Sequence, residues 1–248
     1  MVSYIQTVTW IRHTMAVTTV NSGTSEMLIN KLGLIAHPEG GFFLETHRSG
    51  SGRPMTVRGE TDLNVPEQDL VMTNRTGQRQ DRDGRRNALT SIYWMPTGDS
   101  PILNLSINLS DHVHYYHGGV PFEFIFFDPT SGELSRVVLG GDVMGGQVFQ
   151  LPVKGGTWKC GHMIVPESAD EESKKDMYTL IGEAVAPGFD FHDFTWVTAE
   201  LIHKIAPQYW NALKSFLHDT KRTDSLEGNA RGFKDSEWTN YYDDYLNQ

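Results

Sequence analysis

Short apolar runs separated by turn residues make up the middle of the chain. Leu103, Leu105, Ile107 and Leu109 recur at every second position, which is the period of a strand with one buried face. Between residues 88 and 197 we expect a series of such strands, at 91–95, 103–109, 113–117, 122–127, 134–139, 148–153 and 177–185, with a charged loop at 166–176. Short strands at this spacing predict an all-β barrel or sandwich and not alternating βα units.

The pattern changes on both sides of these strands. Ser25 can cap a short helix over 26–32, and a strand over 42–48 follows it. After Thr198 the apolar residues recur every three or four positions, which predicts two helices, the second beginning at Pro207. We therefore expect three parts: an N-terminal arm (1–25), a β domain (26–198) and a helical C-terminal extension with a polar tail (199–248).

Residues 50–86 interrupt the β domain. They include few large apolar side chains, and a connection of this length is commonly functional or mobile. We expect a mobile insertion or lid, which limited proteolysis should cut first.

The composition narrows the class of protein. The 248 residues include 21 Lys and Arg against 31 Asp and Glu, a formal charge of −10, which disfavours binding to nucleic acid or to an anionic membrane surface. The single cysteine, Cys160, excludes an internal disulfide and any site with several cysteines. No apolar run reaches membrane-spanning length, and the N-terminus lacks the basic and apolar blocks of a secretory signal. We expect a cytoplasmic protein with neither nucleic-acid nor membrane partners.

Four segments carry a resemblance to a known family. They are residues 32–49, with the turn His37-Pro38-Glu39-Gly40-Gly41, and residues 91–95, 117–123 and 178–194. In this order they resemble the cupin family DUF985, whose function is unknown. The resemblance implies a cupin double-stranded β-helix (jelly-roll) barrel with a small-molecule site inside. It also implies a homodimer, to which residues 26–48 or the C-terminal helices would contribute.

The same resemblance bears on metal binding. A metal-binding cupin carries His-x-His, a Glu three or four residues later and a further His on an opposing strand. Counted back from Gly119, the Glu position holds His112, and the first His position holds Ser106. The inherited metal site is therefore missing, and we expect neither a metal nor another cofactor.

Three histidines fall within six residues of one predicted strand. If the face that carries the Glu in metal-binding cupins also faces the interior here, His112, His114 and Tyr116 line the cavity, and His117 lies on the other face or in the turn. Imidazole can exchange protons near pH 7, so activity should follow a titration at roughly pH 6–7. Metal chelation is an alternative, with Glu123 or His162 as a third ligand, and ordinary structural hydrogen bonding is another.

A charged pair lies in the first of the matched segments. Strand alternation puts Glu45 on one face with Phe43 and His47, and Arg48 on the other. A Glu inside a barrel is costly unless it is paired, so Glu45 belongs either to the site or to a buried ion pair. Arg48 could instead bind a substrate carboxylate through its fork of donors.

Together these residues favour a metal-independent cupin enzyme that isomerises, epimerises or cyclises a small organic molecule, as in a biosynthetic pathway. The catalytic candidates are His112, His114, His117 and Glu45. The substrate-binding candidates are Arg48, Tyr93, Tyr116, Glu123 and Trp158, although aromatic residues belong to the core by default. The turn at His37–Gly41 is interpreted as structural, because its glycines permit a tight turn. A non-catalytic binding protein and a metal-dependent oxygenase or lyase remain as alternatives.

Overall fold

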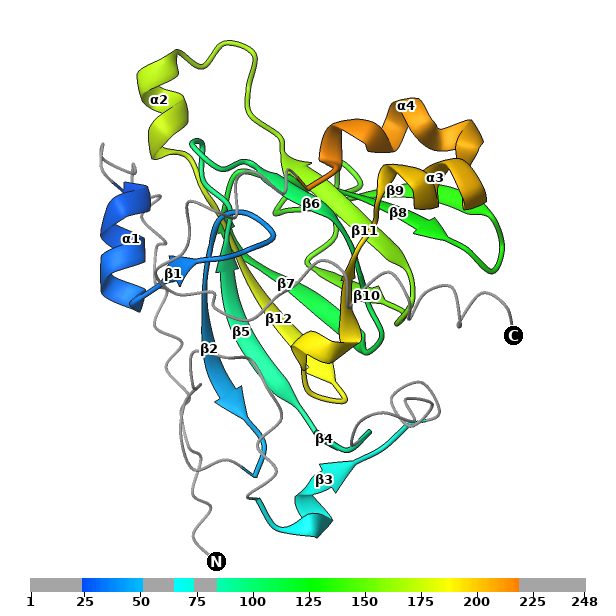
Figure 1. Cartoon of the computed structure of the whole chain (residues 1–248). Coiled ribbons are helices and arrows are strands. Elements are labelled where there is room, and N and C mark those ends of the chain that lie inside the picture. The colour runs from blue at the N-terminus through cyan, green and yellow to red at the C-terminus, as the bar shows by residue number, and fades with distance from the viewer. Residues whose placement is uncertain (1–23, 51–64, 74–83, 219–248) are drawn as a thin grey trace, which may run out of the picture.

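The computed structural model describes residues 24–50, 65–73 and 84–218, and these form a barrel of two facing sheets (Figure 1). The larger sheet has the strand order β1 (Ile35–Ala36), β2 (Phe42–Arg48), β5 (Thr90–Met95), β12 (Thr179–Ala186), β7 (Asp111–Gly119) and β10 (Gln150–Val153). The smaller sheet has the order β13 (Phe194–Trp196), β6 (Ile102–Asn108), β11 (Trp158–Met163), β8 (Phe122–Asp128) and β9 (Glu133–Leu139). The expected all-β cupin architecture is confirmed.

Strand β11 and a short helix are among the elements that the sequence pattern did not predict. Strand β11 was not predicted, because Lys159, Gly161 and His162 interrupt its apolar run. The charged segment expected as a loop contains a short helix, α2 (Glu171–Asp176), which begins where the Asp170 carboxylate accepts a hydrogen bond from the Ser173 amide. Both elements depend on local or cross-strand hydrogen bonds that the apolar pattern does not report.

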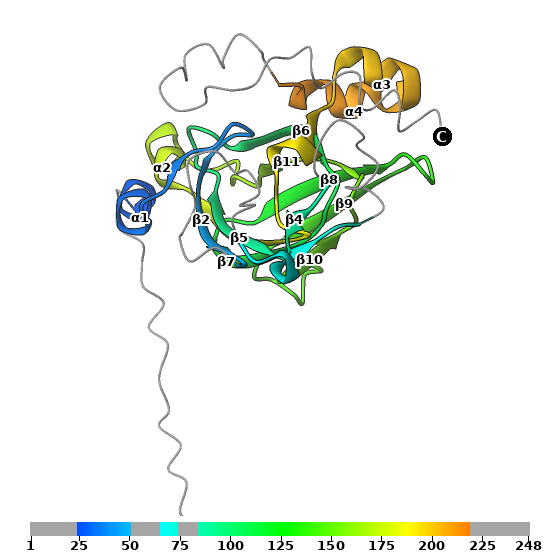
Figure 2. The same ribbon diagram turned by 60° about the horizontal axis from the view of Figure 1, so that its bottom comes forward.

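Two apolar clusters lie on opposite faces of the smaller sheet. The inner cluster lies between the sheets and includes Trp94, Phe122, Phe124 and Ile181. The outer cluster lies beneath the C-terminal helices, α3 (Ala199–Ile205) and α4 (Trp210–Leu213), which cover this face of the barrel (Figure 2). The predicted helical extension therefore packs its apolar side on its own barrel.

A bulge in β6 decides which of its residues face which cluster. The pairing of β6 with β11 shifts register between Lys159 and Gly161, so strict alternation fails along β6. Leu103 packs in the inner cluster, whereas Leu105 and Ile107 pack in the outer one. The shift leaves the side chains of Ser106 and Asn108 facing the interior.

A second bulge brings together Glu45 and Arg48, which alternation had separated. The register of β2 against β5 shifts between Glu45 and His47, so Thr46 and His47 are exposed while Glu45 and Arg48 are both buried. Arg48 donates Nε to Glu45 Oε1 at 2.9 Å and Nη2 to Oε2 at 2.8 Å. Its Nη1 donates to the Asn87 side chain and the Phe189 carbonyl. The expectation that Arg48 binds substrate is wrong, because its fork is occupied within the protein.

The described parts of the predicted insertion are packed. Strand β3 (Leu70–Val71), which follows the short 3-10 helix η1 (Glu67–Asp69), pairs with β4 (Arg86–Asn87). The buried Arg86 donates two hydrogen bonds to Asp193, at 2.6 and 2.8 Å. These residues are therefore paired in the structure, whereas residues 51–64 and 74–83 lie outside the described part of the chain, and the mobility of the insertion stays a prediction.

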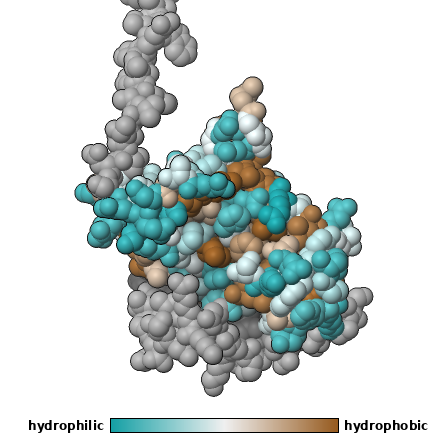
Figure 3. Space-filling view, turned by 90° about the horizontal axis from the view of Figure 1, so that it is seen from above, coloured by the Kyte–Doolittle hydropathy of each residue, from teal (hydrophilic) through white to brown (hydrophobic). Residues whose placement is uncertain are grey.

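On the face that Figure 3 shows, hydrophilic and hydrophobic residues lie side by side at the surface. The large apolar side chains most exposed to solvent are Met144, Met72, Met27, Phe149 and Val143. No helix in the described residues is long and apolar enough to cross a membrane.

The Glu45–Arg48 pair generates a stability prediction. Arg48→Met should lower the free energy of unfolding by about 3–5 kcal/mol, because it leaves a buried carboxylate without its partner. The double variant Glu45→Gln/Arg48→Met should recover part of this loss, since neither charge remains. Urea denaturation followed by tryptophan fluorescence measures both effects.

The exposed ion pair between Arg136 and Glu123 provides the control. Its side chains are 47% and 20% exposed, so Arg136→Met should change the free energy of unfolding by about 1 kcal/mol or less. An equal loss in the two single arginine variants would contradict a special role for the buried pair.

Candidate functional site

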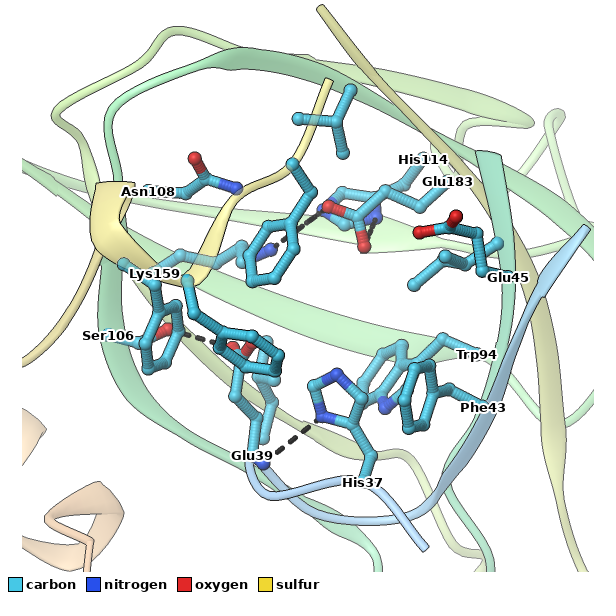
Figure 4. A pocket seen from close by; sticks show the side chains of 16 residues that line it. His37, Glu39, Phe43, Glu45, Trp94, Ser106, Asn108, His114, Lys159 and Glu183 are labelled. Atoms are coloured by element: carbon cyan, nitrogen blue, oxygen red, sulfur yellow. Dashed lines mark hydrogen bonds and ion pairs between the residues drawn. The ribbon is translucent and has the colours of Figure 1, made fainter. Parts of the chain in front are cut away.

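A cavity opens between the two sheets beside the inner cluster (Figure 4). Together with the open solvent at its mouth, it spans about 700 Å³ of space not occupied by protein atoms. Its apolar walls come from Phe43, Ile92, Trp94, Leu103, Val185, Phe189, Phe191 and Phe194. Its polar lining comes from His37, Glu39, Glu45, Ser106, Asn108, His114, Lys159 and Glu183.

The turn before β2 supplies one side of the cavity. Gly40 and Gly41 have φ of 112° and 72°, values that side chains rarely tolerate, and this tight turn directs Glu39 inward. The Glu39 carboxylate accepts a hydrogen bond of 2.8 Å from Ser106 Oγ, and the Glu39 amide donates to His37 Nδ1. The turn interpreted as structural from the sequence therefore also contributes two side chains to the site.

An ion pair and a histidine supply the other side. Lys159 on β11 and Glu183 on β12 come from different sheets, and Lys159 Nζ lies 3.5 Å from Glu183 Oε1. The same Nζ lies 3.4 Å from His114 Nε2, while His114 Nδ1 lies 3.6 Å from Glu183 Oε2. The His114 ring stacks on Phe124, with centroids 4.6 Å apart. Lys159, His114 and Glu183 therefore form one polar chain across the barrel.

His112 comes two residues before His114 on β7 and is also buried. Its Nδ1 lies 3.0 Å from the Ser110 carbonyl, and its Nε2 faces Glu183 Oε1 at 4.0 Å. Neither His112 Nε2 nor His114 Nδ1 has a hydrogen-bond partner among the described residues. Two buried ring nitrogens thus point toward one carboxylate without bonding to it.

Burial keeps these histidines neutral. Desolvation is the main reason that the pKa of His112 falls to about 4 and that of His114 falls well below its ordinary value, and the Lys159 charge acts in the same direction. Burial opposes the charge of Glu183, yet Lys159 and the neighbouring histidines lower its pKa to about 2. The expected imidazole titration at pH 6–7 therefore does not apply to His112 or His114.

Glu39 has a raised pKa, whereas the pKa values of His112 and His114 are lowered. Desolvation raises its pKa to about 7, and Glu183 adds to this rise, although Lys159 and the Ser106 hydroxyl oppose it. Near neutral pH the Glu39 side chain is therefore divided between a proton donor and a proton acceptor.

The donor atoms around Glu183 bear on metal binding. The ligand atoms of His112, His114 and Glu183 lie within 4.8 Å of one another, and two imidazoles with one carboxylate are a common ligand set for transition metals. The third ligand that the sequence left open would thus be Glu183, not Glu123 or His162. However, Lys159 already places a positive charge beside the carboxylate. The donor set fits a metal, and the lysine competes with it.

His112, His114 and Glu45 are all buried, but only His114 and Glu45 are among the residues that line the cavity, and the fourth catalytic candidate lies elsewhere. His117, which alternation places on the other face of the strand from His114, is exposed, and its ring packs edge-on against Tyr93 at 5.8 Å. Neither His117 nor Tyr93 is among the residues that line the cavity.

Three substrate-binding candidates also lie away from the cavity. Tyr116 packs beside the inner cluster and donates its hydroxyl to the Gly119 carbonyl. Glu123 accepts a hydrogen bond of 2.6 Å from Arg136 on the outer side of β8. Trp158 is fully buried in the outer cluster, because alternation on β11 turns Lys159 inward and Trp158 toward the helices.

The sequence offered a signal for the residues that were missed. Lys159 and Glu183 are each the one charged residue in a run of mostly apolar strand residues, in Trp158–Met163 and Thr179–Ala186. A buried charge needs a partner, so two such strands in one barrel predict a cross-sheet pair. Glu39 carried no comparable signal, because it lies in a turn rich in glycine.

The amino-acid sequence of this chain is similar to those of known proteins. The family model described as "Cupin superfamily (DUF985)" matches residues 26–197. An uncharacterized protein of Saccharomyces cerevisiae, YML079W, is 32% identical over 185 residues, which cover 74% of this chain and 81% of the yeast protein.

Two solved structures have a similar fold. A hypothetical protein from Leishmania major is 26% identical, with a TM-score of 0.59, and the match covers 79% of this chain and 99% of that one. Protein SO0799 from Shewanella oneidensis is 23% identical, with a TM-score of 0.57, and the match covers 78% and 97%. Neither name states an activity.

The opposite pKa shifts of His112 and Glu39 predict opposite effects of pH on stability. His112 has a lowered pKa, so its contribution is present above pH 6.5 and is lost as the pH falls toward 4. Glu39 has a raised pKa, so stability is lost as the pH rises from about 4.5 to 7. Each effect amounts to at most about 1.4 kcal/mol per pH unit.

Urea denaturation between pH 5 and 7 tests this prediction in two variants. Relative to the wild type, His112→Gln should gain stability as the pH falls, and Glu39→Gln should gain stability as the pH rises. Parallel curves for the wild type and both variants would show that neither group has a shifted pKa in the folded protein.

Proposed function

We propose that this chain, which belongs to the DUF985 family of the cupin superfamily, is a metal-independent enzyme that isomerises, epimerises or cyclises a small organic molecule by proton transfer. The observation that carries the proposal is the polar chain of Lys159, His114 and Glu183 at the wall of a cavity that opens to the solvent. The named relatives are themselves uncharacterized, so the proposal rests on the site and not on their names.

Lys159 is suited to stabilise negative charge on the substrate. An ammonium in a cavity with apolar walls interacts strongly with an oxygen that becomes anionic, as a carbonyl oxygen does when a neighbouring carbon loses its proton. Glu183 and His114 hold the lysine in place from two directions, at 3.5 and 3.4 Å. His114, being neutral, can accept a proton once Lys159 moves toward the substrate.

Glu39 is suited to act as the second proton-transfer group. It comes from the turn before β2, whereas Glu183 and His114 come from β12 and β7, and Figure 4 draws them on different sides of the cavity. Its pKa of about 7 matches the optimum for general acid–base work at neutral pH. Groups on two sides allow a proton to leave one position of the substrate and return at another, as isomerisation and epimerisation require.

Glu45 has a supporting role in this proposal. Although it lines the cavity, both of its oxygens accept hydrogen bonds from Arg48. It shapes and rigidifies the wall beside β5 without exchanging protons.

A non-catalytic binding protein would use the same cavity without turnover. Incubation with small carbonyl compounds in deuterium oxide, followed by proton NMR, separates the two functions, because only proton transfer replaces carbon-bound hydrogen with deuterium. A ligand that binds and shows no exchange or conversion would favour the binding protein.

The activity prediction concerns Glu39 and His114. With a substrate found in this way, Glu39→Gln and His114→Gln should each lower turnover by about 10²-fold or more, the usual scale for a positioned acid or base. Glu39→Gln should also remove the part of the pH–rate profile that titrates near pH 7. Chelators should leave the wild type unaffected.

His117→Gln is the matched control. This histidine lies on the same strand as His114 but outside the cavity, so its replacement should leave turnover unchanged. If Glu39→Gln keeps both the rate and the pH profile of the wild type, Glu39 takes no part in the reaction.

A homodimer in the cytoplasm completes the proposal. The exposed apolar side chains of Met27 and Ile35, which are 57% and 40% exposed, support an interface at residues 26–48. Light scattering at micromolar concentration should give a mass near twice 28.0 kDa. Met27→Asp/Ile35→Asp should shift that mass toward the monomer, and a monomeric wild type would contradict the proposal.

A further inference from the structure

The two histidines beside Glu183 carry the ring proton on the same nitrogen, Nδ1, but turn different nitrogens toward the carboxylate. In the neutral ring one nitrogen donates and the other accepts, and the hydrogen-bond partner decides which. His112 Nδ1 faces the Ser110 carbonyl at 3.0 Å, and a carbonyl only accepts, so Nδ1 carries the proton. His112 Nε2 therefore directs a free lone pair toward Glu183, which is the form that a metal ion requires.

His114 is held in the same tautomer, but the nitrogen that it turns toward Glu183 is the protonated one. Its Nε2 faces the Lys159 ammonium at 3.4 Å, and an ammonium only donates, so Nε2 must accept. The ring proton is then on Nδ1, the nitrogen that faces Glu183 at 3.6 Å. A protonated Nδ1 cannot coordinate a metal, even though its position completes the set of three donors.

We propose that His112 Nε2, His114 Nδ1 and a Glu183 oxygen form a latent site for a divalent transition metal, which Lys159 closes by fixing the proton of His114 on Nδ1. Zn²⁺, Co²⁺ and Ni²⁺ are the ions that suit two imidazoles and one carboxylate. Lys159 is a positioning residue here: it acts on His114 from the side of the ring away from the metal position. The inference does not depend on the proposed enzymatic activity, because it concerns which cation this buried carboxylate takes.

Two further observations support the site. His112 Nε2 and His114 Nδ1 are buried and have no hydrogen-bond partner among the described residues, so the contact of His114 Nε2 with Lys159 is the one that has to change before both nitrogens can act as ligands. His112, His114 and Glu183 are 3%, 1% and 9% exposed, which shields a bound ion from water. The partner of the non-coordinating nitrogen commonly sets the tautomer and affinity of a metal-binding histidine, and here that partner is Lys159.

The experiment changes Lys159 and measures metal binding at one fixed neutral pH. Lys159→Met removes the ammonium, and Lys159→Gln supplies an amide oxygen that can accept a proton from His114 Nε2. Metal-free protein is titrated with CoCl2, followed by visible absorption, and with ZnCl2, followed by calorimetry. Both variants should bind one equivalent at least 10- to 100-fold more tightly than the wild type, the range measured for partners of metal-bound histidines.

Three controls make the result specific. Lys159→Arg keeps a side chain that only donates hydrogen bonds, so the metal site of this variant should stay closed, as in the wild type. Lys154→Met removes a lysine from an exposed position and should change nothing. Adding Glu183→Gln to Lys159→Met should abolish the gain, because the carboxylate ligand is lost.

Nitrogen-15 NMR of the histidine rings provides a readout that does not need tight binding. In the wild type, His112 and His114 should both carry the ring proton on Nδ1. In Lys159→Met, added Zn²⁺ should move the His114 proton to Nε2. Three results would each overturn the proposal. The wild type could carry the ring proton on His114 Nε2, or it could bind the metal tightly and stoichiometrically. The third is that folded Lys159 variants bind the metal no more tightly than the wild type does. None of these measurements uses activity, so the proton-transfer function stands or fails on its own test.

Discussion

The ion pair between Lys159 and Glu183 is the constraint on which the interior of this barrel depends. The lysine comes from the five-stranded sheet and the glutamate from the six-stranded one, so the pair joins the two sheets at the cavity wall. A carboxylate taken out of water is costly unless a cation remains close to it. The positions of β11 and β12 are therefore coupled, and the two histidines on β7 must adapt to a charge that is already balanced.

That balance explains the protonation of the surrounding groups. Because Lys159 compensates Glu183, a second positive charge on His112 or His114 would be buried without need, and both rings remain neutral. Burial disfavours a negative charge on Glu39, and the charge of Glu183 adds to this effect, so Glu39 keeps its proton up to about pH 7. Arg48 neutralises Glu45 separately. The cavity is thus close to electrically neutral at neutral pH, which suits a substrate that becomes charged only during the reaction.

Much of the fold could be predicted from the sequence, and less of the site. Period-two strands and helical spacing after Thr198 predicted most of the elements, because hydrophobic periodicity reports burial directly. Alternation put His112 and His114 on a buried face of the strand and His117 on the other face, in agreement with their burial. It failed for Arg48, because a bulge in β2 changes the face of the residues that follow it. Lys159 and Glu183 meet only when the sheets face each other, a relation that no single strand contains.

The same charge argument shows what separates a metal site from a metal-free one in this barrel. Any occupant beside Glu183 must bring positive charge, and both an ammonium and a metal ion can do so. The two differ in what they demand of His114: the ammonium needs a lone pair on Nε2, whereas a metal ion at the Glu183 side needs one on Nδ1. Since one neutral ring cannot satisfy both, the choice of cation is exclusive. Lys159 on β11 can therefore determine whether this site holds a metal ion, without any change in the ligands or strands around it.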